Sequence, residues 1–265
     1  MLQPAPRGFA PNSGSRLRRI LFYACAGLLA LITSADFISH ALGFGAPHQI
    51  HVVVHEVVSA TIIAAAISQL IAPRRFVAAA QMLVALFILA WAFDALTLRF
   101  SGLGVVLLLG LGVALTHPAR GEVFSLRGAF RPWLAGLTAL AAGPLLSFSL
   151  GQAALQRADI APIHASLGHW EWAATWAAML VALGVVAALG ARGACLAAWS
   201  AGLGAVAYGL ASLLYAGEAS AASQSWAIAA IVGGALFVAV AEWDARRVSG
   251  AYYAQRSGAT RPTHA

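Results

Sequence analysis

Long apolar runs separated by short polar segments constrain this chain more than any other feature. Eight of them follow one another, at 20–43, 49–72, 76–98, 101–117, 133–154, 163–190, 194–215 and 224–243. Each is close to the roughly 17–25 residues that an α-helix needs to cross a bilayer. Only 9% of the residues are charged, whereas a soluble domain carries about 25%. The pattern predicts an all-α integral membrane protein, a bundle of eight transmembrane helices.

The arginines predict how these helices are oriented. With the N-terminus in the cytoplasm, every arginine lies in an inner segment except Arg99 and Arg157. Short cytoplasmic loops of membrane proteins carry such an excess of basic residues. Both termini are therefore predicted to be cytoplasmic, and the Lys-free, Ala- and Gly-rich composition favours a bacterial inner membrane. The net charge of +7 does not indicate nucleic-acid binding, because the arginines are spread over short loops.

The longest polar connection divides the chain into two halves. We expect a disordered N-terminal tail at 1–15, helices one to four at 16–117, a cytoplasmic linker at 118–132, helices five to eight at 133–243 and a disordered C-terminal tail at 244–265. The dipeptides Ile50-His51 and Ile163-His164 stand at the start of the second helix of each half. They indicate a weak internal duplication, in which two four-helix repeats are parallel.

The first apolar run allows two interpretations. It follows Arg16, Arg18 and Arg19, as the apolar core of a signal peptide would, and Thr33-Ser34-Ala35 is a possible cleavage point. The run continues past that point and is long enough to span a membrane. Its length favours an uncleaved first helix.

Histidines and carboxylates gather near the outer ends of the predicted helices. Such groups are costly at membrane depth and usually face the bundle interior or a cavity. They therefore predict a site for a metal ion or a haem. The candidate ligands are His51, His55, His164 and His169; further ligands or supporting groups are Asp36, His40, His48, Glu56 and Glu171.

Helical spacing predicts which of these side chains share a face. His51 and His55 lie one turn apart on one face, and Glu56 points away from His51. On the sixth predicted helix, His164 and His169 are expected to point in different directions. One helix alone cannot supply a full ligand set, so a site needs the second and sixth helices together, with the first helix adding Asp36 or His40.

The ligand types leave several cofactors open. Imidazole and carboxylate suit copper(II), zinc or iron, and no methionine lies near the cluster to favour copper(I). A b-type haem held between His51 and His164 is the other candidate. The His-x3-His spacing at His51 and His55 is not the HExxH motif of zinc proteases.

Two families resemble parts of this pattern. The His-x3-His and His-x4-His pairs are similar to the first histidine box of membrane di-iron desaturases, but the sequence contains no His-His pair for that family's later boxes. The predicted four-plus-four layout with outer histidines resembles the architecture of the haem A synthases. That family's motif residues are not found here in register, so the resemblance concerns architecture alone.

Three functions remain open on the sequence. The first is a haem or metal protein for electron transfer or for metal or haem handling, with a respiratory or other membrane complex as its partner. The second is a small-solute or proton-coupled transporter that uses the same residues as a proton relay. The third is a cofactor-free assembly or scaffold protein. The lipid bilayer is the partner common to all three, and the sequence assigns no catalytic residue.

Overall fold

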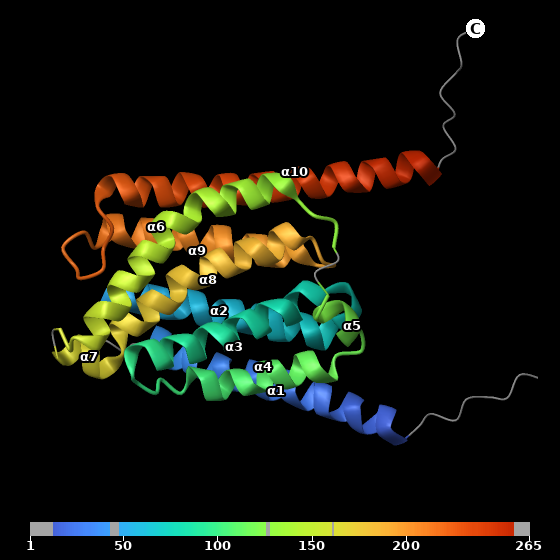
Figure 1. Ribbon diagram of the computed structural model, residues 1–265, viewed down its shortest axis with the longest axis horizontal. Helices are drawn as coiled ribbons and strands as arrows, with labels where there is room; N and C mark the ends of the chain where they lie inside the picture. Colours follow the sequence, from blue (N-terminus) through green and yellow to red (C-terminus); the bar gives the residue numbers. More distant parts are fainter. Residues whose placement is uncertain (1–12, 43–47, 126–127, 161, 257–265) are drawn as a thin grey trace, which may run out of the picture.

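The computed structural model describes residues 13–42, 48–125, 128–160 and 162–256, and these residues form helices joined by turns, without strands (Figure 1). The predicted tail at 1–15 lies almost wholly outside the described residues. The elements are α1 (Ser13–Ala41), α2 (Gln49–Ile71), the 3-10 turn η1 (Pro73–Arg75), α3 (Val77–Thr97), α4 (Leu103–Thr116), α5 (Arg120–Val123), α6 (Pro132–Arg157), α7 (Pro162–Leu167), α8 (His169–Leu189), α9 (Ala194–Leu214) and α10 (Gln224–Arg256).

Seven of the described helices are long and apolar enough to cross a membrane, which confirms a multi-pass helical membrane protein. They are α1, α2, α3, α6, α8, α9 and α10. The helix α4 has only 14 residues, fewer than the roughly 17–25 that a bilayer requires. The long helices run side by side, with α1 and α10 on opposite sides of the bundle (Figure 1).

The helix α8 lies at the centre of the bundle. It packs against α2, α3, α6 and α9, and Trp176, Met179 and Leu183 are buried among them. The outer helices α1, α6 and α10 bury far less of their surface. Their outward side chains are apolar because lipid, rather than water, is the solvent they face.

Two of the helices differ from their predicted extent. The run at 163–190 is not one helix: it divides into α7 and α8 at Gly168, whose φ of +75° belongs to the left-handed region that glycine adopts without strain. The last helix, α10, continues through residues 244–256, where we expected the C-terminal tail to begin. Residues 257–265 of that tail lie outside the described residues.

Glycines bring α9 and α10 into close contact. A Cβ atom on Gly202 would lie 2.6 Å from the carbonyl oxygen of Gly234, so neither position has room for a side chain. Small residues of this kind let membrane helices approach closely. The neighbouring Gly233 has no atom near its Cβ position. Gly234 therefore serves helix packing, and α10 runs through both glycines without a break.

Replacing Gly234 by alanine should weaken the α9–α10 contact, because the new methyl group meets backbone atoms that cannot move aside. We expect a loss of about 1–3 kcal/mol in the free energy of unfolding, the usual cost of overpacking. Chemical denaturation of the detergent-purified protein measures it. The matched control is Gly233→Ala, which should be neutral or slightly stabilising, and equal behaviour of the two variants would contradict this packing.

Candidate metal centre

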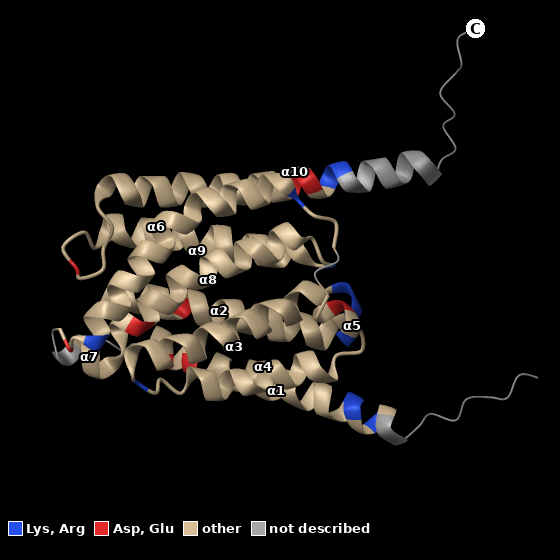
Figure 2. Ribbon diagram, in the orientation of Figure 1, with Lys and Arg blue, Asp and Glu red and all other residues tan. Residues whose placement is uncertain are grey.

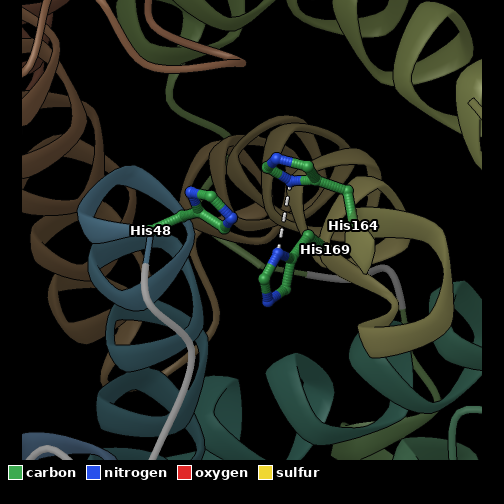
Figure 3. A group of neighbouring side chains, drawn as sticks. All are labelled: His48, His164 and His169. Carbon is green, nitrogen blue, oxygen red and sulfur yellow. Dashed lines mark hydrogen bonds between the residues drawn. The ribbon is translucent and has the colours of Figure 1, made fainter. Parts of the chain in front are cut away.

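The histidine-bearing segments of α2 and of α7 and α8 meet at one end of the bundle, which we call the histidine end. His48 precedes α2, His164 lies in α7 and His169 is the first residue of α8. Figure 3 shows the rings of His164 and His169 facing one another, with His48 beside them. The Nδ1 atoms of His164 and His169 are 3.3 Å apart, and the rings of His48 and His164 stack with centroids 4.1 Å apart.

These three side chains, which we call the outer triad, could hold a metal ion. One nitrogen of each ring lies within 4.8 Å of the others. Zinc–nitrogen bonds are about 2.0–2.1 Å long, so neighbouring ligands of a tetrahedral ion stand roughly 3.4 Å apart. The separation of 3.3 Å between His164 and His169 matches this value. The nitrogen of His48 lies within 4.8 Å of both and completes the set of three.

The turn at Gly168 creates this arrangement. On a continuous helix, residues five apart point about 140° away from one another, and the sequence predicted that His164 and His169 would diverge. That prediction is wrong, because the left-handed conformation of Gly168 breaks the helix between them. Their ring nitrogens consequently come into contact instead.

Side chains from α3 and α6 satisfy the backbone groups that the turn exposes. The guanidinium group of Arg99, which follows α3, donates hydrogen bonds to the carbonyl oxygens of Ala165 and Ser166. The side-chain NH₂ group of Gln156 also donates to the carbonyl oxygen of Ala165, at 2.8 Å. The side-chain oxygen of Gln156 accepts a hydrogen bond from the backbone N–H of Glu171, at 3.3 Å. Buried backbone groups need such partners inside a membrane protein.

His51 lies next to the outer triad, deeper in the bundle. Its ring stacks on that of His169, with centroids 4.6 Å apart, and is 2% exposed. Neither of its ring nitrogens has a hydrogen-bond partner among the described residues. A buried polar group without a partner is costly. The ring nitrogens of His51 are therefore a further pair of candidate donors for a metal ion at the outer triad.

A second group of possible ligands, the inner triad, consists of Asp36, His40 and His55. The Nε2 atom of His55 lies 3.2 Å from Oδ2 of Asp36, and Nδ1 of His40 lies 3.6 Å from Oδ1 of the same carboxylate. One ligand atom from each residue lies within 4.8 Å of the others. Glu56 stands beside the group, with Oε1 3.5 Å from Nδ1 of His55.

The carboxylate of Glu218 holds the α2 side of the site in place. It accepts a hydrogen bond of 2.9 Å from the backbone N–H of Ile50, at the start of α2 where N–H groups lack helical partners. This contact fixes the start of α2, which follows directly after His48. Burial lowers the pKa of His164, with His48 adding to the effect and Glu218 opposing it. A lowered pKa favours the neutral imidazole, which is the form that binds metals.

The sequence predicted nine residues as ligands or supporting groups, and the structure places them in different surroundings. Eight lie in or beside the two triads. The exception is Glu171, which is buried against α3 and accepts a hydrogen bond of 3.4 Å from Thr97. Sequence reasoning missed Gly168, Gln156 and Glu218 as supporting groups. It did contain a signal for Arg99, as one of only two arginines outside the arginine-rich segments.

The donor groups fit a metal ion and do not fit a haem. The rings of His51 and His164 have centroids 5.1 Å apart and an interplanar angle of 64°. The rings of His48 and His169 pack against the same pair. A haem would have to occupy the space that these imidazoles fill.

Comparison of the chain with protein-family models, curated proteins and solved structures finds no match in any of the three.

Replacing Arg99 by glutamine should destabilise the α7–α8 turn, because the carbonyl groups of Ala165 and Ser166 lose a charged donor. The expected loss is about 1–3 kcal/mol in the free energy of unfolding. Denaturant titration in detergent measures it. Arg157→Gln, on the exposed end of α6, is the control and should leave stability within about 0.5 kcal/mol. Identical midpoints for the two variants would overturn the assigned role of Arg99.

Proposed function

We propose that the protein binds a divalent transition-metal ion, zinc or copper(II), through the outer triad of His48, His164 and His169. The observation that carries this proposal is the approach of three imidazole nitrogens from separate elements to within 4.8 Å. Neutral imidazole is a ligand type that suits zinc, copper, iron and nickel. The half-buried positions of His48 and His164 leave the triad accessible from the membrane surface.

The inner triad supplies a second metal position in this proposal. His55 lies seven positions after His48, which corresponds to a rise of about 10 Å along the axis of α2. The unpartnered ring of His51 lies between them, and its nitrogens give a metal ion an intermediate contact. Asp36 and Glu56 add negative charge on the inner side, which favours a cation there. The arrangement suits a protein that takes up a metal ion and holds it for delivery.

The distribution of polar groups favours metal handling over transport. After Glu56, α2 contains no titratable side chain, and α8 contains none after Glu171. The buried polar side chains that follow next on these two helices, Ser59, Thr61 and Thr175, carry hydroxyl groups and no charge. A proton relay across the membrane would need titratable groups there. A pure scaffold, in turn, gives no reason for a buried imidazole without partners.

The proposal includes the membrane orientation that the arginines predict. Figure 2 shows that basic residues gather at the end where α5 lies, which we call the arginine end, while acidic residues are more frequent at the histidine end. We propose that the arginine end is cytoplasmic, that α4 is a short eighth membrane segment and that the two halves are parallel repeats. The histidine end then faces outward from a bacterial inner membrane, where a respiratory complex or another membrane complex could receive the metal.

Replacing His164 by alanine should weaken zinc binding by at least about tenfold, since metal sites lose this much even from changes beyond the direct ligands. Calorimetric titration of chelator-treated protein in detergent measures the affinity. The control variant is His40→Ala, which removes a ligand of the inner triad and should leave the zinc affinity of the outer triad unchanged. Failure of the wild-type protein to bind zinc or copper(II), or an unchanged affinity in His164→Ala, would refute the proposal.

A further inference from the structure

A cavity at the arginine end combines strong positive charge with an apolar wall. It has a volume of about 520 Å³ and lies between the start of α1, the η1 turn after α2 and the end of α4. The basic residues that line it are Arg18, Arg19, Arg74 and Arg75. All four are exposed, and they come from two segments that are far apart in the sequence.

These four arginines have no carboxylate partner among the described residues. Three acidic side chains lie at the arginine end, none of them lines the cavity, and each has another partner. The pairs are Glu122 with Arg192, Asp244 with Arg131 and Glu242 with Trp199. The cavity therefore concentrates uncompensated positive charge, and an anion is the ligand that complements it.

The rest of the cavity is suited to an amphiphile. Phe22, Tyr23 and Pro73 contribute apolar and aromatic surface beside the guanidinium groups. Tyr23, at the edge of the cavity, is 39% exposed, and α1 beyond the cavity presents apolar side chains such as Ile20, which is 55% exposed. A free phosphate ion would use the charge of this cavity but not its apolar wall.

We propose that the cavity binds the headgroup of an anionic phospholipid, whose acyl chains leave the cavity beside Tyr23 for the lipid around α1. The guanidinium groups bind the lipid phosphate, as basic pockets between helices at the cytoplasmic surface do. The bound lipid would hold the start of α1 against the turn between α2 and α3. This site does not depend on the histidines and stands apart from the proposed metal function.

Lipid retention tests the proposal directly. The full chain is reconstituted in nanodiscs that contain equal amounts of phosphatidylglycerol and phosphatidylcholine, then released and analysed by native mass spectrometry. We expect the wild-type protein to retain phosphatidylglycerol selectively. In the double variant Arg74→Gln/Arg75→Gln, the ratio of retained phosphatidylglycerol to phosphatidylcholine should fall at least about tenfold. Each arginine near an anionic surface contributes on the order of 1 kcal/mol to binding.

The matched control is Arg246→Gln/Arg247→Gln, a neighbouring pair on α10 on the opposite side of the bundle (Figure 1). It removes the same charge at the same end and should keep the preference. If the Arg74→Gln/Arg75→Gln protein does not fold, Arg18→Gln/Arg19→Gln replaces it. Equal retention in the cavity variant and the control would overturn the proposal, as would displacement of the lipid by millimolar inorganic phosphate.

Discussion

The left-handed turn at Gly168 is the feature on which the histidine end depends. Non-helical backbone is tolerated within a membrane protein only where other groups satisfy its N–H and C=O groups. Here Arg99 and Gln156 reach the turn from α3 and α6 and supply those hydrogen bonds. The turn thereby joins three helices, and it places His164 against His169. A straight helix over the same residues would have separated the two rings.

The bundle divides its polar groups between its two ends. The histidine end combines imidazoles and carboxylates in two neighbouring triads, and the arginine end carries guanidinium groups around a cavity. The core between them is mostly apolar, with Met179 and Leu183 buried and with uncharged groups such as Thr175 as its polar side chains. Both proposals rest on this separation, which would let one small chain hold a cation at one end and engage an anionic lipid at the other.

Much of the architecture could be predicted from the sequence because hydropathy and length determine which helices span a membrane. The apolar runs located the seven long helices, and histidine spacing indicated that the second and sixth runs belong to one site. The turn at Gly168 could not be predicted in the same way. A glycine between two histidines is also compatible with a continuous helix, and helical periodicity then gives the wrong relation between His164 and His169.

The division of the candidate ligands into two triads was equally inaccessible to sequence reasoning. His51 and His55 share a face of α2, which suggested that they act together. Tertiary packing separates them, because α1 brings Asp36 and His40 to His55 while α8 brings His169 to His51. Which neighbour a side chain meets depends on helix crossings, and the spacing within one helix does not encode them.

The central claim is that three imidazoles from separate elements coordinate one metal ion. X-ray absorption spectroscopy tests it most directly, on the His40→Ala protein loaded with one equivalent of zinc in detergent, so that the inner triad does not contribute to the signal. The account predicts three imidazole nitrogens at about 2.0 Å from the zinc, and two in the His48→Ala protein. A first coordination shell made only of oxygen atoms, or a shell unchanged by His48→Ala, would contradict the claim.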